Sequence, residues 1–252
     1  MSEVIKNRYE FVILFDVENG NPNGDPDAGN MPRVDPETGF GLVTDVCLKR
    51  KIRNYVQTVK EDATGYRIYV KDGVPLNRSD NEGFAQAGIA DAASQKADAL
   101  QKTVKARREG GVDVDAVVRD WMCANFYDIR TFGAVMTTMV KGALNCGQVR
   151  GPVQLGFARS VEPVMPQEVT ITRVAITTEA DAEKKDTEMG RKHILPYGLY
   201  RCEGSISANL PRNVTGVTAD DLALLFEAIS NMFAQTLSSA LGHLAARKLT
   251  AC

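Results

Sequence analysis

Runs of apolar residues alternate along the chain with long polar stretches, and the first such pair is the most informative. Residues 11–15 are continuously apolar, which predicts a strand that is buried on both faces or central in a sheet. Residues 16–30 are mostly Asp, Asn, Gly and Pro and predict a long loop, and a helix is expected from Thr44 because threonine caps a first turn well. A strand, a glycine-rich loop and a helix in this order can hold an anion with freed backbone N–H groups.

The helix after Thr44 is expected to have two distinct faces. Its apolar residues repeat at helical spacing and predict a core face formed by Leu48, Ile52, Tyr55, Val56 and Val59. Lys49 and Arg53 are four residues apart on another face, with Arg50 beside them. Two interpretations of these cations stay open, a solvated helix back or a row that reaches neighbouring phosphate groups.

The middle of the chain predicts one more strand and a helical insertion. Residues 66–70 alternate in polarity and predict a strand, residues 71–83 are rich in turn residues, and residues 84–108 predict an exposed helical insertion. Asp113 is expected to cap a further helix, in which Trp121 is a core anchor rather than a base-stacking platform.

Two later stretches carry loop and hairpin signals. Residues 142–156 are punctuated by glycine around Arg150, so a backbone can approach closely there. Strand patterns at residues 169–176 and 194–206 flank the charged residues 179–188, which predicts a long protruding β-hairpin.

The last helix completes the predicted fold. Thr218 and Asp221 have the spacing of a capping box, and the apolar spacing that follows predicts one long helix through Leu244. The predicted order is strand, helix, strand, insertion, strand, hairpin, strand and helix. We therefore predict an α+β fold with two helices on one face of an antiparallel sheet, a modified ferredoxin-like or RNA-recognition-motif plan.

Composition and charge narrow the function only slightly. The chain has 252 residues and a formal net charge of −2, so a nucleic-acid surface requires segregated charge. Acidic residues outnumber basic ones over residues 1–40, and the reverse holds over residues 41–71, although an ordinary mixed surface explains this pattern as well. The five cysteines contain no CxxC pair, which gives zinc no support, and no signal peptide or long apolar run occurs. We expect a cytoplasmic protein with reduced thiols and no membrane contact.

The residues of common enzyme sites are scarce. His193 and His243 lie on different predicted elements, and neither is placed as an oriented general base. No Walker loop and no dinucleotide fingerprint occurs, so a small-molecule enzyme is disfavoured and no cofactor is expected.

The polar loop also resembles part of a calcium site. Asn19, Asn21, Asn23 and Gly24 follow the EF-hand register, but Asn30 stands where the final bidentate glutamate belongs. A calcium site is therefore disfavoured, and no metal is expected.

Several segments of the chain resemble the backbone subunit of CRISPR Cascade surveillance complexes, and the type I-C (Csd2-like) group in particular. The segments that carry this resemblance are residues 7–33, 42–53, 126–136, 145–152 and 189–194. The resemblance implies an RNA-recognition-motif palm, helical fingers at residues 71–128 and a β-hairpin thumb at residues 177–196. It also implies a non-catalytic subunit whose copies assemble head to tail along CRISPR RNA beside other Cascade subunits, and whose guide bases pair with target DNA. Such an assembly needs phosphate contacts rather than base readout, because the guide sequence varies.

The matched segments supply the expected RNA contacts. They are Asn19, Asn21, Asn23, Arg33, Thr44, Lys49, Arg50, Arg53, Phe132, Gln148, Arg150, Met189 and Lys192. Within the resemblance, Thr44, Lys49 and Arg53 match a phosphate-holding helix, Met189 is a wedge near a displaced nucleotide, and Lys192 lies near the RNA backbone. Family members usually continue past the last helix into strand-forming residues, so we expect this chain, which stops at Cys252, to lack that strand.

One nuclease alternative remains from the first loop. Asp25 or Asp27 could bind magnesium and cut RNA, and related RNA-targeting complexes place a catalytic aspartate in this loop. The simpler interpretation is that these carboxylates bond to their own backbone as Asx turns.

Overall fold

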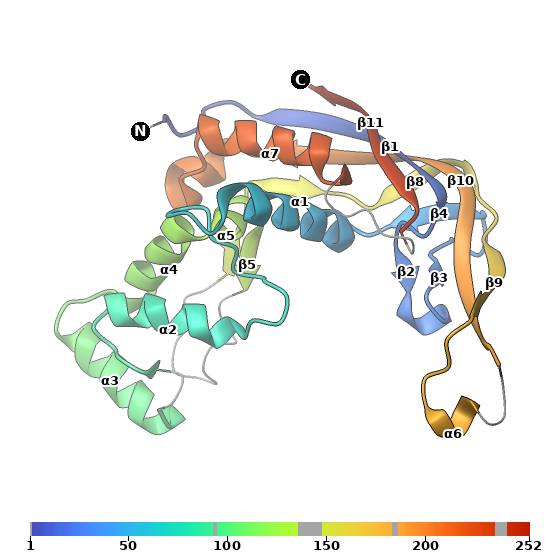
Figure 1. The fold of residues 1–252 in the computed structure, drawn as a ribbon. Coiled ribbons are helices and arrows are strands. Elements are labelled where there is room, and N and C mark those ends of the chain that lie inside the picture. The colour runs from blue at the N-terminus through green and yellow to red at the C-terminus, as the bar shows by residue number, and fades with distance from the viewer. Residues whose placement is uncertain (1, 93–94, 136–147, 183–185, 235–240) are drawn as a thin grey trace.

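The computed structural model describes residues 2–92, 95–135, 148–182, 186–234 and 241–252 (Figure 1). A seven-stranded antiparallel sheet forms the centre. Five of its strands follow the order β11-β1-β10-β8-β4, and β7 and β9 (Gln167–Arg173) also pair with β10. The other strands are β1 (Tyr9–Gly20), β4 (Phe40–Val43), β7 (Val153–Leu155), β8 (Ala158–Pro163), β10 (Glu188–Ile206) and β11 (His243–Ala251).

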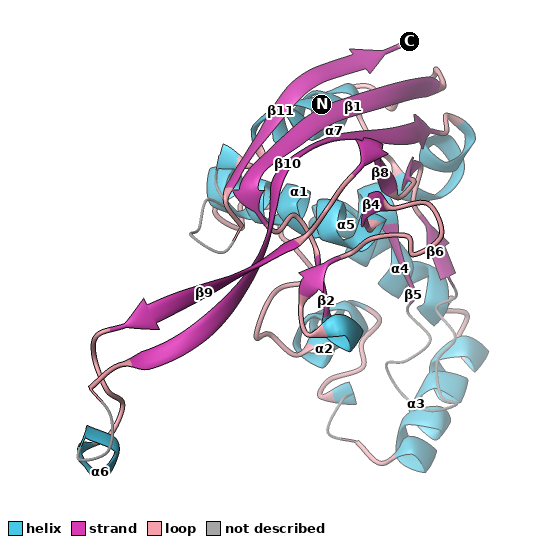
Figure 2. Ribbon diagram, turned by 90° about the vertical axis from the view of Figure 1, so that its right-hand side faces the viewer, coloured by secondary structure: helices cyan, strands magenta, loops and turns pink. Residues whose placement is uncertain are grey.

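Two helices, α1 (Asp45–Lys60) and α7 (Ala219–Asn231), cover one face of this sheet and leave the other face open (Figures 1 and 2). If β4 and the other additions are set aside, β1, α1, β8, β10, α7 and β11 follow one another in the chain with the spatial strand order β11-β1-β10-β8. That arrangement is the ferredoxin-like plan. The predicted α+β fold with an antiparallel sheet is therefore confirmed.

The first strand is central, as its sequence predicts, but it is buried on one face only. Phe11, Ile13 and Phe15 point into the core under the helices, whereas Val12 and Leu14 are partly exposed on the open face. Gly204 faces Phe11 across the ladder, and a Cβ on Gly204 would lie 2.2 Å from the Phe11 ring. The ring of Phe11 thus occupies the space that any side chain at position 204 needs.

Helix α1 starts and packs largely as predicted. The hydroxyl of Thr44 accepts a hydrogen bond from the backbone N–H of Cys47 at 3.2 Å, which caps the first turn. Leu48, Ile52, Tyr55 and Val56 are buried. The prediction for Val59 is wrong, because core packing ends at Val56 and Val59 is 43% exposed in the last turn.

The helical insertion has a core of its own, so the prediction of an exposed insertion is wrong in that respect. A second hydrophobic cluster, separate from the one under the sheet, lies in this insertion. It includes Phe84, Leu100, Val118 and Met122, all buried, with Trp121 packed edge-on against Phe126. The turn-rich stretch at residues 71–83 is largely helical, since α2 begins directly after Pro75. We call this part the helical lobe; its helices are α2 (Leu76–Gln86), α3 (Ala97–Glu109) and α4 (Val114–Asn125), followed by α5 (Tyr127–Phe132).

The strand predicted at residues 66–70 does not form. Only an isolated bridge joins Arg67 to Phe126. The backbone N–H groups of Tyr69 and Val70 donate instead to the carboxylate of Asp128, at 2.8 and 3.1 Å. A side chain from α5 thus takes the bonds that a neighbouring strand would supply.

The predicted hairpin is confirmed. Strand β9 (Gln167–Arg173) pairs with the first part of β10, from Ile194 opposite Gln167 to Glu188 opposite Arg173, with α6 (Glu179–Ala182) beyond. Every residue of β9 is exposed, and the hairpin projects away from the sheet (Figure 2). The helical lobe and this hairpin descend from opposite ends of the sheet (Figure 1).

The end of the chain differs from its prediction. Thr218 and Asp221 form the expected capping box, but α7 ends at Asn231 rather than at Leu244. Gly242 has a φ of 68°, and Leu244 then enters the core from β11, which pairs with β1. The expectation that the chain lacks a last strand is therefore wrong, because helical spacing of the leucines concealed that strand.

The remaining short elements lie at the edges of the fold. They are β2 (Gly24–Asp25), η1 (Pro26–Ala28), β3 (Met31–Pro32), β5 (Gly133–Val135), β6 (Gln148–Arg150) and η3 (Pro211–Thr215). No helix among the described residues is long and apolar enough to cross a membrane.

Candidate nucleic-acid interface

The polar stretch after β1 is folded back on itself rather than extended. Strands β2 and β3 pair, and the Nδ2 of Asn21 donates to the backbone carbonyl of Asn30 at 2.7 Å. A Cβ at Gly24 would lie 1.9 Å from the side-chain oxygen of Asn30, so this close approach requires glycine. Asn19, at the exposed end of β1, has a φ of 49° and turns the chain into this stretch. We call residues 19–33 the first loop.

Asn23 ties the first loop to the start of α1. Its Oδ1 accepts hydrogen bonds from the backbone N–H of Thr44 at 2.9 Å and from the Thr44 hydroxyl at 3.0 Å. Because both side chains bond to the chain itself, they fix where the loop and the helix meet.

The carboxylate of Asp25 in the first loop has structural partners. Asp25 accepts a bond from the backbone N–H of Asp27 at 3.2 Å and caps η1. Arg33 forms an ion pair with Asp25 at 3.4 Å. For Asp25 this is the Asx-turn geometry that the sequence suggests. No group of three or more His, Cys, Asp or Glu side chains gathers as a metal site among the described residues.

Two cations of α1 meet at one aromatic ring. The Nζ of Lys49 lies 5.8 Å and the guanidinium carbon of Arg53 lies 5.3 Å from the centre of the Phe132 ring. Lys49 also pairs with Asp45 at 2.9 Å, and Arg53 pairs with Asp128 at 2.8 Å. Phe132 is only 8% exposed, so its ring supports these cations and leaves little face for a base.

The other basic residues of α1 face elsewhere. Arg50 forms an exposed ion pair with Asp72 at 3.1 Å, on the side of the helical lobe. Lys51 is 6% exposed, and burial lowers the pKa of its ammonium group. Cys47, in the same turn, hydrogen-bonds to the carbonyl of Pro22 at 3.5 Å, and burial raises the pKa of its thiol. This thiol therefore stays protonated and is a poor nucleophile.

Phe132 also borders a cleft that contains two further expected contacts. Strands β5 and β6 place Gly133 opposite Arg150, and a Cβ on Gly133 would lie 2.3 Å from the carbonyl oxygen of Val149. The cleft beside these strands has a volume of about 660 Å³ and is lined by Phe132, Gln148 and Arg150, among others. Residues 136–147, which include parts of two segments that resemble Cascade backbone subunits, lie outside the described residues.

A second cleft separates the first loop from the hairpin. It has a volume of about 490 Å³ and is lined on one side by Asn21, Gly24, Gly29 and Asn30. Arg191, Lys192 and His193 line the opposite side. Arg191 pairs with Glu168 at 3.2 Å, which holds its guanidinium at the base of the hairpin. Met189 lies further along the hairpin and is 75% exposed, outside this cleft.

The structure thus brings the expected residues together in two groups. Lys49, Arg53, Phe132, Gln148 and Arg150 form one, and Asn21 and Lys192 belong to the other. Asn23 and Thr44 stand between them, at the junction of the first loop and α1.

The sequence prediction omits Asp128, Arg191 and His193. Arg191 and His193 flank the predicted contact Lys192, so this short basic run is a sequence signal for both of them. Asp128 carries no local signal, because its partners Arg53 and Tyr69 are distant in the sequence.

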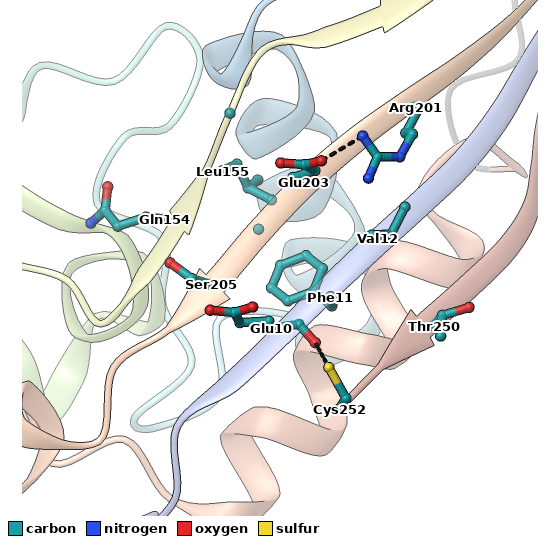
Figure 3. A pocket seen from close by; sticks show the side chains of 12 residues that line it. Glu10, Phe11, Val12, Gln154, Leu155, Arg201, Glu203, Ser205, Thr250 and Cys252 are labelled. Atoms are coloured by element: carbon teal, nitrogen blue, oxygen red, sulfur yellow. Dashed lines mark hydrogen bonds and ion pairs between the residues drawn. The ribbon is translucent and has the colours of Figure 1, made fainter. Parts of the chain in front are cut away.

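The open face of the sheet is a poorer candidate for an anionic ligand. A hollow of about 580 Å³ lies there, with Val12 and Leu155 in it and Glu10 and Glu203 beside them (Figure 3). These two carboxylates pair with Arg8 and Arg201, so the positive charge is neutralised locally. The candidate interface is therefore the side that bears α1, the first loop and the hairpin.

An antiparallel sheet with two helices on one face, a helical lobe and a projecting hairpin defines an α+β protein of the ferredoxin-like class. Residues 7–252 match the sequence profile of the family described as CRISPR-associated protein Cas7. The chain belongs to this Cas7 family.

Known proteins agree with this assignment. The chain is 30% identical over 224 residues to the CRISPR-associated protein Cas7 of Haloferax volcanii, an alignment that covers 81% of this chain and 59% of that relative. The chain therefore spans somewhat more than half of the relative's length. A chain of a solved CRISPR RNA-guided surveillance complex, in a pre-nicking state, shares the fold with a TM-score of 0.53 and 17% identity, over 93% of this chain and 74% of that one.

Proposed function

We propose that this chain is a non-catalytic backbone subunit of a type I-C Cascade surveillance complex that coats CRISPR RNA in the cytoplasm. Copies associate head to tail along the guide, beside other Cascade subunits, and leave guide bases available for pairing with target DNA. In this proposal the helical lobe provides fingers at residues 71–128, and the hairpin provides a thumb at residues 177–196.

The observation that carries the proposal is the placement of cations on both sides of the first loop. Lys49 and Arg53 lie on the α1 side, and Arg191 and Lys192 lie across the cleft from Asn21 and Asn30. These contacts suit phosphate groups, since Lys and Arg neutralise a backbone without reading its bases. Family membership and the fold shared with a surveillance-complex chain support the same function.

Binding to single-stranded RNA tests the proposal. Fluorescence anisotropy with two unrelated RNA sequences of equal length should give similar affinities, because phosphates rather than bases are contacted. The logarithm of the affinity should fall steeply with the logarithm of salt concentration, by about 0.7 for each phosphate contact. Equal binding at low and high salt would contradict the proposal.

Two single variants localise the contact. Lys49→Ala should weaken binding and flatten the salt dependence by about 0.7, one contact. Lys105→Ala removes the same charge from an exposed position of α3, where Lys105 is 79% exposed, and should leave the salt dependence unchanged. Equal effects of the two variants would place the RNA elsewhere.

The nuclease alternative is tested in the same samples. Incubation with magnesium should leave the RNA intact, because Asp25 caps η1 and pairs with Arg33. Magnesium-dependent cleavage that Asp25→Ala or Asp27→Ala abolishes would establish the alternative instead.

A further inference from the structure

Helix α5 is a short buried junction between the helical lobe and the rest of the fold, which we call the sheet domain and which consists of the central sheet with α1 and α7. All six of its residues are buried, including the ionisable Asp128 and Arg130. Arg130 bonds to Asp221 of α7 at 2.7 and 3.0 Å and to the backbone carbonyl of Cys123 in α4 at 2.9 Å. Asp128 faces the opposite way, toward α1 and the start of the lobe.

The carboxylate of Asp128 is held by three donors. Its Oδ1 accepts from the backbone N–H of Tyr69 at 2.8 Å, and its Oδ2 accepts from the backbone N–H of Val70 at 3.1 Å and from the Nε of Arg53 at 2.8 Å. The side chain of Asp128 is 1% exposed, so water does not compete for these bonds. A carboxylate fixed by two backbone amides cannot turn, and it therefore sets the orientation of its third donor.

Two neighbours therefore hold the guanidinium of Arg53, one at its Nε and the other against its flat face. Asp128 binds its Nε, and the ring of Phe132 lies 5.3 Å from its central carbon. The two terminal nitrogens of Arg53 donate to no residue in the described part of the chain. Arginine typically uses such a pair of terminal donors to bind two oxygens of one phosphate.

We propose that Asp128 is a positioning residue, which holds Arg53 by its Nε so that both terminal nitrogens point at one phosphate group of the bound RNA. This inference rests on the proposed RNA-binding function. It also links RNA contact to the helical lobe, because the same carboxylate anchors Tyr69 and Val70.

The sign of the effect separates positioning from simple charge. Removing the negative charge of Asp128 makes the region more positive, so electrostatics alone predicts tighter RNA binding by Asp128→Asn. Positioning predicts the opposite, because Asp128→Asn removes the charge that binds the Nε of Arg53. In either orientation, the asparagine amide also turns a donor toward the backbone N–H of Tyr69 or of Val70. The structure therefore predicts about tenfold weaker binding for Asp128→Asn, in line with the loss of a charged hydrogen bond.

The test compares Asp128→Asn, Arg53→Ala and the double variant in the anisotropy assay across salt concentrations. Both single variants should lose about one phosphate contact from the salt dependence, and the double variant should bind like Arg53→Ala. Asp221→Asn is the matched control, since it breaks the other buried ion pair of α5 without touching Arg53. It should lower the melting temperature and leave the salt dependence unchanged.

A second variant keeps the test decisive if Asp128→Asn does not fold. Arg53→Lys retains the charge and Asp128, but the compact ammonium lacks the planar fork by which arginine binds Asp128 at one nitrogen and two phosphate oxygens at the other two. It should weaken binding nearly as much as Arg53→Ala. Wild-type affinity for Arg53→Lys or Asp128→Asn, or additive losses in the double variant, would overturn the inference while the RNA-binding function stands. A wild-type chain that binds no RNA would overturn the proposed function itself.

Discussion

The buried carboxylate of Asp80 is predicted to reduce stability at neutral pH. Asp80 lies in α2 and is 3% exposed, with a hydrogen bond from the hydroxyl of Tyr69 at 2.9 Å. Burial raises the pKa of Asp80 from the usual 3.8 to about 6, and the bond from Tyr69 opposes this rise only partly. Asp80→Asn keeps an acceptor for Tyr69 and removes the charge.

The size and sign of the effect follow from this pKa. One pKa unit corresponds to about 1.4 kcal/mol, so the ionised group costs about 3 kcal/mol of unfolding free energy above the folded-state pKa. Below the unfolded-state pKa the group is protonated in both states and costs nothing. Because the folded-state pKa is higher than the unfolded-state pKa, the free energy of unfolding is highest below pH 3.8 and falls as pH rises from 3.8 to about 6.

Trp121 provides the readout. It is the single tryptophan of the chain and lies in α4, which packs against α2 in the helical lobe. Urea unfolding followed by its fluorescence should show Asp80→Asn more stable than the wild type by about 3 kcal/mol at about pH 8. The two proteins should differ little at about pH 4, because the wild-type group is then neutral.

Two further variants make this prediction refutable. Asp120→Asn changes an aspartate that is 63% exposed on α4, and it should show no comparable difference between the two pH values. Tyr69→Phe removes the bond that lowers the pKa of Asp80, so it should move the loss of stability to higher pH. An Asp80→Asn variant that is no more stable at about pH 8 than the wild type would refute the reasoning.

Two predictions concern packing and capping. Gly204→Ala should lower the free energy of unfolding by about 1–3 kcal/mol, because the new Cβ would lie 2.2 Å from the Phe11 ring. Chemical denaturation should show that adding Phe11→Leu to Gly204→Ala partly restores this stability. Equal stability of Gly204→Ala with and without Phe11→Leu would refute the clash. Thr218→Ala should cost about 1 kcal/mol by removing the cap of α7, whereas Thr58→Ala on the exposed face of α1 should cost nothing in the same assay. Equal losses at both positions would show that the capping box contributes little.

Patterns that depend on neighbours in the sequence predicted much of the sheet domain. The apolar run from Phe11, the cap at Thr44 and the capping box at Thr218 each depend on residues a few positions apart, and the structure confirms the central strand and both caps. The hairpin followed from the same kind of signal, because two strand patterns flank a charged tip.

The errors arise where distant partners decide the structure. Tyr69 and Val70 look like strand residues, yet Asp128 takes their N–H groups from nearly sixty positions away. Leu244 fits the spacing of a helix, yet it packs into the core from a strand beside β1. The buried faces of α2 and α3 were not apparent either, because small and charged residues dilute their apolar pattern.

The candidate site shows the same division. The sequence indicated the cations of α1 and the polar first loop, and it left open whether those cations face solvent or a ligand. It did not show that Asn23 bonds to Thr44, that Arg50 turns toward Asp72, or that Arg53 is held by Asp128. Those outcomes depend on which side chains the fold brings within bonding distance.

The most direct test of the central claim is an electron-microscopy reconstruction of the chain assembled on a single-stranded RNA. The account predicts repeated protomers with one RNA strand running past Lys49 and Arg53 and through the cleft between Asn30 and Lys192. RNA on the open face of the sheet beside Glu10 and Glu203, or protomers without any RNA at the first loop, would contradict it.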